Sequence, residues 1–124
     1  MKITDVAFFA YAVSDMKTAR AFYEGVLKLT PNSEFDGSNN AHWVEYDVGS
    51  ATLGVGCAPG MWEPSPKGAS AALEVDDFGA AVDAIKAQEI PVVMGPHDFP
   101  TCEMIVIADP DGNRITLHKR KARG

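Results

Sequence analysis

Apolar and polar residues follow one pattern twice along the chain. Residues 3–13 form an apolar run rich in β-branched and aromatic side chains, which predicts a strand. Residues 69–75 form a second run of the same kind. Three residue types recur at an offset of 62, with Val13 matching Val75, Asp15 matching Asp77 and Ala19 matching Ala81. The chain therefore contains an internal repeat.

A helix is expected after each of these strands. Ser14 or Asp15 can cap the first helix, and Asp76 or Asp77 the second, because a side-chain oxygen there accepts a free first-turn N–H. Apolar residues then recur at helical spacing and form one stripe. The stripes consist of Met16, Ala19, Tyr23, Val26 and Leu27 and of Phe78, Ala81, Val82 and Ile85, and the elements end before Pro31 and Pro91.

Three further strand-like segments follow each helix. Gly49-Ser50 and residues 109–113 supply turns, and residues 58–68, with three prolines and two glycines, predict a linker. The sequence therefore predicts a single α+β domain, residues 1–124, built from two tandem βαβββ units of about 1–57 and 69–120. The remaining strands are expected at about 33–36, 41–48 and 51–57 and at about 91–94, 102–108 and 113–119.

One helix can cover only one face of a four-stranded sheet. The other face needs the second sheet, a ligand or a partner chain to bury it. In the last strand, Ile115 and Leu117 suit the helix-covered face, whereas Arg114, Thr116 and His118 alternate with them. We expect the units to form a cupped mixed sheet around a cavity, with the helices on the outside. The alternative is that the mixed face simply meets water.

Composition narrows the classes of function. The 124 residues carry a formal net charge of −6, which argues against binding to nucleic acid or to anionic membrane surfaces. The N-terminal apolar run, about nine residues, is too short to span a bilayer and lacks a signal-peptide pattern. Two cysteines, Cys57 and Cys102, form no disulfide framework, so we expect free thiols and a cytoplasmic protein.

Two motifs resemble a known superfamily. Residues 13–15 and 19–27 (VSD and ARAFYEGVL) are similar to its opening helix, and residues 109–117 (DPDGNRITL) to its closing hairpin. The chain thus resembles the vicinal-oxygen-chelate superfamily of glyoxalases, bleomycin-resistance proteins and extradiol dioxygenases. The resemblance covers essentially the whole chain and implies the fold. It leaves the chemistry open, because the superfamily includes isomerases, lyases, dioxygenases, thiol transferases and drug-binding proteins.

The resemblance also implies where a metal would bind. Enzymes of the superfamily usually hold a divalent ion at four strand positions, which correspond here to Phe8, Gly54, Ser70 and Thr116. The first two side chains offer no donor atom, and the hydroxyls of the other two are weak ligands beside histidine or carboxylate. We therefore expect neither a metal site nor another cofactor.

Glu74 and Arg114 are expected on the cavity face. A carboxylate there needs a partner, because an isolated buried charge costs several kcal/mol. Either Glu74 forms a salt bridge with Arg114, or its pKa is raised and it serves in acid–base chemistry. His118 on the same face either contacts a ligand or is an exposed histidine at a strand end. His97 is expected to be solvated in a loop.

The register of the strand 41–48 decides which side chains reach the cavity. The resemblance places Trp43 and Glu45 there, and a shift of one residue would replace them by His42, Val44 and Tyr46.

Two further residues have alternative interpretations. Cys102 is either a reactive thiol near the cavity mouth or a buried inert one. Trp62, beside Met61 in the linker, either covers a ligand or packs against a second subunit.

Together these residues favour a small-molecule binding protein without a metal, similar to the bleomycin-resistance type. The alternatives are a lyase, isomerase or dioxygenase-like enzyme, metal-free or with non-standard ligands, and a module whose open sheet face binds another protein. The resemblance also implies a homodimer. The predicted ligand-binding residues are Phe8, Trp43, Glu45, Trp62, Ser70, Glu74, Cys102, Arg114, Thr116 and His118, with a small organic molecule as the expected partner.

Overall fold

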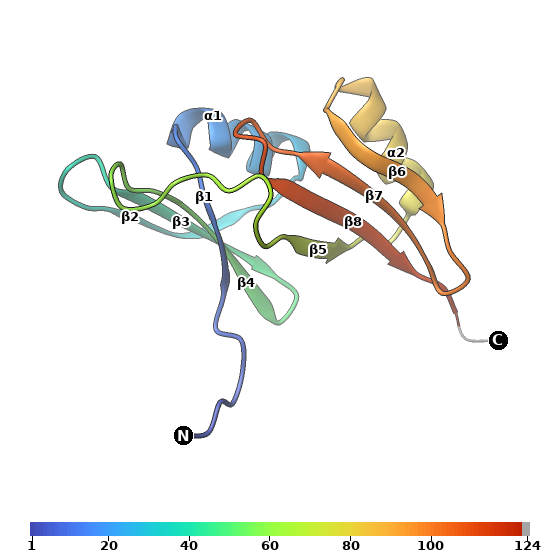
Figure 1. Ribbon diagram of the computed structural model, residues 1–124, viewed down its shortest axis with the longest axis horizontal. Helices are drawn as coiled ribbons and strands as arrows, with labels where there is room; N and C mark the ends of the chain where they lie inside the picture. The colour runs from blue at the N-terminus through green and yellow to red at the C-terminus, as the bar shows by residue number, and fades with distance from the viewer. Residues whose placement is uncertain (123–124) are drawn as a thin grey trace. The chain divides into compact units, whose positions relative to one another are not determined.

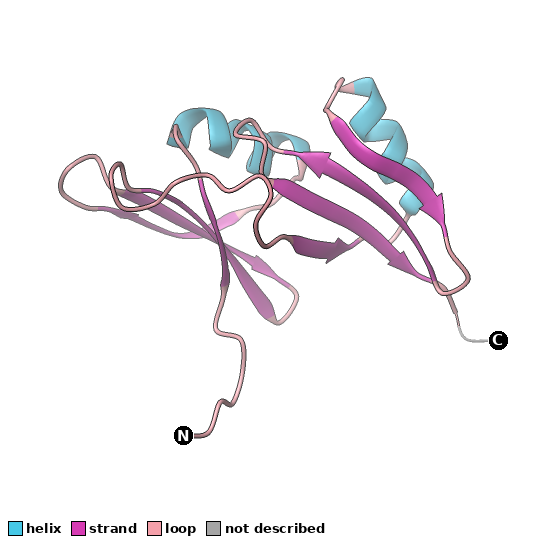
Figure 2. Cartoon of the chain, in the orientation of Figure 1, coloured by secondary structure: helices cyan, strands magenta, loops and turns pink. Residues whose placement is uncertain are grey.

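Two four-stranded sheets, each with its own helical segment, make up the computed structural model, which describes residues 1–122. Contacts divide the chain into two units, Met1–Pro64 and Ser65–Gly124, so the boundary lies inside the predicted linker. Each unit has the order βαβββ (Figures 1 and 2), which confirms the predicted α+β fold with two tandem units. No helix in the described residues is long and apolar enough to cross a membrane.

Unit 1 has the strand order β1–β4–β3–β2, with β1 parallel to β4 and the other pairs antiparallel. Ala10 pairs with Gly54 across β1 and β4. The elements of unit 1 are β1 (Phe9–Ala12), α1 (Met16–Arg20), the π-helical segment η1 (Ala21–Val26), β2 (Pro31–Asp36), β3 (His42–Val48) and β4 (Ala51–Cys57).

Unit 2 repeats this topology with the order β5–β8–β7–β6. Ala72 pairs with Thr116 across the parallel strands β5 and β8, so the offset of 62 residues relates the paired strands of the two units. The elements of unit 2 are β5 (Ala71–Glu74), α2 (Phe78–Ala87), β6 (Val92–Asp98), β7 (Cys102–Ala108) and β8 (Arg114–Arg120).

Both helices begin at a predicted cap residue. The Asp15 carboxylate accepts the N–H of Thr18 at 2.9 Å, and the Asp77 carboxylate accepts the N–H of Ala80 at 3.0 Å. The α1 helix packs on β4 and α2 packs on β7 and β8, each within its own unit (Figure 1). One face of each sheet is therefore covered by a helix, and the other is not.

The helix-covered cores of the two units differ in chemistry. Unit 1 buries stacked aromatic rings, since Tyr23 and Tyr46 are both 0% exposed and their centroids lie 6.3 Å apart. The Tyr46 hydroxyl donates a hydrogen bond to the Glu24 carboxylate at 2.9 Å, and burial together with that carboxylate raises the pKa of Tyr46. Unit 2 instead buries aliphatic side chains, which are Ile85, Val82, Ile105, Val106, Ile107, Ile115 and Leu117 beside Phe78.

The turn before β8 is held by buried polar side chains. The Asp109 carboxylate accepts the N–H groups of Asp111 at 3.0 Å and Asn113 at 2.8 Å. The Asn113 side chain donates to Asp109 and accepts the N–H of Ser65 at 3.0 Å. Gly112 in the same turn has φ +84°, a conformation that glycine adopts without strain. The motif at 109–113 is thus explained by local structure.

Two sequence predictions of strand length are wrong. The strand predicted over 3–13 forms only at Phe9–Ala12, because Phe9 already pairs with Leu53, two residues from the start of β4. Residues 3–6 would extend beyond β4, the strand with which β1 pairs. The strand predicted at 91–94 extends instead over Val92–Asp98, so His97 lies in a strand rather than a loop, and it is exposed.

Candidate functional site

The uncovered sheet face of unit 1 carries all three aromatic residues of the predicted binding site. Tyr46 is buried on the helix side of β3, so Trp43 and Glu45 lie on the opposite face. Trp43 pairs with Gly56 and Glu45 with Gly54, so the alternative register is wrong. We call this surface, with these two residues and two glycines, the open face of unit 1.

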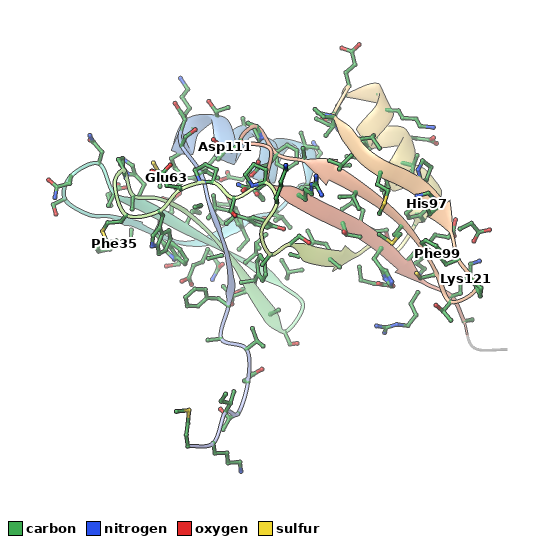
Figure 3. The ribbon with its side chains drawn as sticks, viewed as in Figure 1. Phe35, Glu63, His97, Phe99, Asp111 and Lys121 are labelled. Atoms are coloured by element: carbon green, nitrogen blue, oxygen red, sulfur yellow. The ribbon has the colours of Figure 1, made fainter. Side chains whose placement is uncertain are left out.

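Three aromatic rings form a cluster on the open face of unit 1. The Trp43 ring lies 5.4 Å from Phe8 at 75° and 5.5 Å from Trp62 at 71°, both edge-to-face arrangements. Phe8 and Trp62 remain 49% and 41% exposed. Phe35, which Figure 3 labels on β2, pairs with Trp43 in register and is 65% exposed. The cluster is therefore an accessible aromatic surface, and we call Phe8, Trp43 and Trp62 the aromatic cluster.

Two glycines in β4 make room for these rings. A methyl group at Gly54 would lie 2.4 Å from Cζ2 of Trp43. A methyl group at Gly56 would lie 2.5 Å from Cζ3 of Trp62 and 2.8 Å from Cε3 of Trp43. These separations are far below ordinary contact distances, so the indole rings pack directly on the glycine backbone.

Glu45 places a carboxylate at the edge of the aromatic cluster. One of its oxygens accepts the indole N–H of Trp43 at 2.9 Å. In the part of the chain that the structure describes, no basic side chain forms an ion pair with Glu45. Residues 1–64 contain four Lys and Arg against eight Asp and Glu, a formal charge of −4. The open face of unit 1 is therefore aromatic with a carboxylate at its edge.

The uncovered face of unit 2 centres on Glu74 and His118, which pair across β5 and β8. One Glu74 oxygen lies 2.5 Å from Nδ1 of His118, and the other accepts the backbone N–H of Arg120 at 2.6 Å. Both predictions for Glu74 are wrong. The register places it opposite His118 rather than Arg114, and the hydrogen bonds from Arg120 and then His118 lower the pKa of Glu74 instead of raising it.

Cys102 lies on the same face of unit 2 and is partly exposed. Together with His118 it lines a cavity of about 380 Å³. Figure 3 labels Phe99 and Lys121 at this end of unit 2. The full lining consists of Pro100, Thr101, Cys102, His118, Arg120, Lys121 and Ala122.

The predicted site residues thus fall into two groups. Phe8, Trp43, Glu45 and Trp62 lie together in unit 1. In unit 2, Glu74, Cys102 and His118 lie around one end of β8, whereas Ser70 precedes β5, Arg114 begins β8 and Thr116 pairs with Ala72 in mid-strand.

The chain matches a known protein family over most of its length. Residues 5–117 match the family model of the Glyoxalase/Bleomycin resistance protein/Dioxygenase superfamily. The chain belongs to this superfamily. The resemblance inferred from the opening and closing motifs is therefore confirmed, while no significant match is found among curated proteins.

Several solved structures share the fold along nearly the whole chain. TnmS3, an antibiotic binding protein from Streptomyces sp. CB03234, is 25% identical with a TM-score of 0.77, over 98% of this chain and 99% of that chain. A putative glyoxalase family protein from Bacillus anthracis is 22% identical with a TM-score of 0.74, over 98% of each chain. The virulence protein STM3117 from Salmonella typhimurium is 24% identical with a TM-score of 0.71, over 98% of this chain and 100% of that chain.

The residues that the resemblance assigns to the superfamily's metal positions include no histidine and no carboxylate. Gly54 lies under the Trp43 ring, and the Phe8 ring packs on the same indole. Ser70 and Thr116 offer only neutral hydroxyls. Within each unit, the described residues include no group of three or more His, Cys, Asp or Glu that could hold a metal ion. The absence of a metal nevertheless stays a prediction.

Two residues that support the candidate sites were missed from the sequence. Gly56 supports both indole rings, and its spacing from Gly54 in a strand was the available signal, because alternate residues share one face. Arg120 holds Glu74 through its backbone N–H, a contact that no side-chain pattern can reveal.

Proposed function

We propose that the protein binds a small, flat organic molecule on the open face of unit 1, and that it does so without a metal ion. The aromatic cluster beside the Glu45 carboxylate carries this proposal. Accessible aromatic rings offer stacking surface, and ligand sites combine such surface with a few polar groups that fix orientation.

The similarity to TnmS3 supports a role in binding. That protein is an antibiotic binding protein and is 25% identical to this chain over nearly its full length. Binding of an organic molecule is the property that we propose for this chain as well.

We expect Glu45 to make the site selective for ligands that carry a hydrogen-bond donor or a positive charge. Its carboxylate would accept a hydrogen bond from the ligand, and a positive charge on the ligand would be favoured by the carboxylate and by the indole faces. The formal charge of −4 in residues 1–64 acts in the same direction.

Fluorescence offers a direct test, because the chain has two tryptophans and both lie in the aromatic cluster. A panel of planar heteroaromatic compounds, cationic and neutral, is titrated while tryptophan emission is recorded. We expect saturable quenching by at least one compound. Trp43→Leu and Trp62→Leu should each weaken binding at least tenfold, which corresponds to about 1.4 kcal/mol.

Phe99→Leu is the matched control, since Phe99 is an exposed aromatic residue of unit 2 outside the cluster. It should leave the dissociation constant unchanged by calorimetry. Binding that is equally strong in both tryptophan variants, or no binding across the panel, would contradict the proposal.

Elemental analysis tests the metal-free part of the proposal. The purified protein should contain no stoichiometric divalent metal, because of the side chains at Phe8, Gly54, Ser70 and Thr116. About one Zn, Ni, Mn or Fe ion per chain, lost on mutation of neighbouring residues, would overturn it.

We also propose a homodimer in the cytoplasm. Met1, Ile3, Val6 and Phe8 are all exposed in one chain, and pairing of two chains would bury such apolar surface. Light scattering at micromolar concentration should give twice 13.3 kDa, and a value of 13.3 kDa would contradict the dimer.

The free thiols of Cys57 and Cys102 favour a reducing compartment, which cell fractionation would test.

A further inference from the structure

Unit 2 brings a thiol, an imidazole and a carboxylate to one end of its open face. Glu74 is fixed by two contacts, 2.5 Å to Nδ1 of His118 and 2.6 Å to the backbone N–H of Arg120. If Nδ1 carries the proton donated to the carboxylate, Nε2 of His118 is left as a free acceptor. The imidazole is thereby oriented and able to take a proton from a neighbour.

Cys102 is that neighbour by strand register. It pairs with Arg120, and Met104 pairs with His118, so Cys102 and His118 are diagonal neighbours on the same sheet face. Diagonal positions in an antiparallel pair are about 7–8 Å apart, which long and aromatic side chains can span. Both residues line the same cavity of about 380 Å³.

Several charged side chains lie at the end of unit 2 that holds the thiol. His118, Arg120 and Lys121 line the cavity together with Cys102. Glu74 lies on β5 opposite His118, and on β6 His97 pairs with Met104 and Asp98 with Glu103. The Lys121 ammonium pairs with Asp98 and His118 pairs with Glu74. The charge of Arg120 acts on Glu74, but its guanidinium makes no ion pair within residues 1–122 and can therefore attract an anionic ligand.

We propose that Cys102 is a nucleophilic thiol that adds to small acidic molecules containing an α,β-unsaturated carbonyl group. His118 takes the proton from the Cys102 sulfur, and the resulting thiolate forms an S–C bond to the β-carbon. The π electrons move onto the α-carbon and carbonyl oxygen, and the proton on His118 then passes to the α-carbon. No other reactant is required. Glu74 acts as a positioning residue for the imidazole, and Arg120 attracts the acidic group.

The second cysteine provides an internal reference. Cys57 is only 7% exposed, and its thiol donates to the backbone carbonyl of Ser14 at 3.5 Å. It also pairs with a histidine, since His42 lies opposite it and forms its own ion pair with Asp36 at 2.6 Å. A histidine next to a cysteine is thus common to both units, but only Cys102 lines a cavity with a cation.

The test measures alkylation of each cysteine by peptide mass analysis of the full-length protein. The probes are N-ethylmaleimide, which is neutral, and 3-maleimidopropionate, which has the same reactive ring and a negative charge. The reference rate is that of Cys102 in the urea-unfolded chain. At pH 6.5, where an ordinary thiol is only about 1% ionised, native Cys102 should react roughly tenfold faster than this reference. Cys57 should react more slowly than its own unfolded reference.

The pH profile separates the proposed roles from a merely structural one. His118→Asn should return the rate at pH 6.5 to the unfolded reference and have little effect at pH 9, where hydroxide ionises the thiol. Glu74→Gln should cause a smaller loss, roughly threefold, in the same pH range. His42→Asn removes a comparable histidine–carboxylate pair from unit 1 and should leave the Cys102 rate unchanged.

Three outcomes would overturn the proposal. The first is a native Cys102 rate at pH 6.5 no higher than the unfolded reference. The second is a pH profile unchanged by His118→Asn in a folded variant; if that variant does not fold by circular dichroism, an unchanged profile in Glu74→Gln has the same weight. The third concerns the acidic ligand. The anionic probe should react a few-fold faster than the neutral probe at low salt and lose this advantage at high salt, and equal rates would refute that part.

Discussion

In unit 1, Gly54 and Gly56 leave the open sheet face without side chains at two alternate positions of β4, and indole rings lie on the backbone there. In unit 2, the positions related by the 62-residue offset hold Thr116 and His118, and the face between them and β5 is polar. The strand order is the same in both units, and the parallel pairs β1–β4 and β5–β8 share one register. The repeat therefore specifies the backbone, whereas the side chains at a few open-face positions decide whether a face suits aromatic stacking or proton transfer.

The helix-covered faces show a parallel contrast. Unit 1 stacks Tyr23 on Tyr46 and places a buried phenol on Glu24, so its core combines aromatic packing with a hydrogen bond. Unit 2 fills the same layer with aliphatic residues such as Ile105 and Ile115, both 0% exposed. One topology can be stabilised by either kind of core, because burial of apolar area matters more than its composition.

The largest expected effect comes from truncating these cores. Tyr23→Ala should lower the free energy of unfolding by about 3–5 kcal/mol, and Ile115→Ala by about 2–5 kcal/mol. Urea unfolding followed by tryptophan emission reports on unit 1 alone, whereas circular dichroism reports on both units. A loss below about 1 kcal/mol for Tyr23→Ala would mean that the aromatic stack does not support unit 1.

Substitutions on the open faces should lower the free energy of unfolding less than the core truncations do. Gly54→Ala should cost about 1–3 kcal/mol, because the new methyl group would lie 2.4 Å from the Trp43 ring and force the indole to move. Its tryptophan emission should shift, and ligand quenching should weaken. The matched change in unit 2, Thr116→Ala, should leave the emission unchanged. An unshifted Gly54→Ala spectrum would show that Trp43 does not pack on β4 in solution.

Carboxylates in the two units should differ in the pH dependence of stability. The guanidinium of Arg20, 2.5 Å from Glu24, holds the pKa of Glu24 below its ordinary 4.5, with a further hydrogen bond from Tyr46. A lowered folded-state pKa adds stability above the unfolded value, and this stability is lost as the pH falls through the folded-state pKa. Acid unfolding between about pH 5 and pH 3 should therefore be flatter in Glu24→Gln than in the parent.

Glu74 in unit 2 provides the comparison for this measurement. Its pKa is also lowered, by the backbone N–H of Arg120 and then by His118. Its side chain is 47% exposed against 29% for Glu24, so solvent screens its contacts more strongly. Glu74→Gln should flatten the acid limb less than Glu24→Gln. The reverse order would show that unit 2 depends on its polar face for stability.

Strands with a regular alternation were predictable, and strands that depend on a partner were not. The segments 41–48, 51–57, 102–108 and 113–119 agree with β3, β4, β7 and β8 within a residue or two, because one face of each is buried. Residues 3–6 have strand composition but would extend beyond the start of β4, the strand with which β1 pairs. The β6 strand contains Pro96, which an edge strand tolerates because one side of its backbone is unpaired.

The sequence predicted which residues belong to each candidate site better than it predicted which of them lie opposite one another. Alternation placed Glu74, Arg114 and His118 on one face, but it could not give the shift between two parallel strands that sets Glu74 opposite His118. The position of Trp62 on Gly56 was equally hidden, because it depends on the path of a linker rather than on a periodic pattern. Register and loop path are tertiary properties, and a single sequence constrains them weakly.

The smallest expected effect concerns the two histidine–carboxylate pairs. The His42–Asp36 pair is exposed, with Asp36 81% exposed, so His42→Asn should change the free energy of unfolding by less than about 1 kcal/mol. His118→Asn should have a similarly small effect, because Glu74 keeps its hydrogen bond from the backbone N–H of Arg120. The pairs should nevertheless differ in chemistry, since only His118 shares a cavity with a partly exposed cysteine. Urea denaturation of both variants, alongside the alkylation rates, measures both properties in the same samples. A large stability loss in His118→Asn alone would assign that pair a structural role and remove the distinction between the two units.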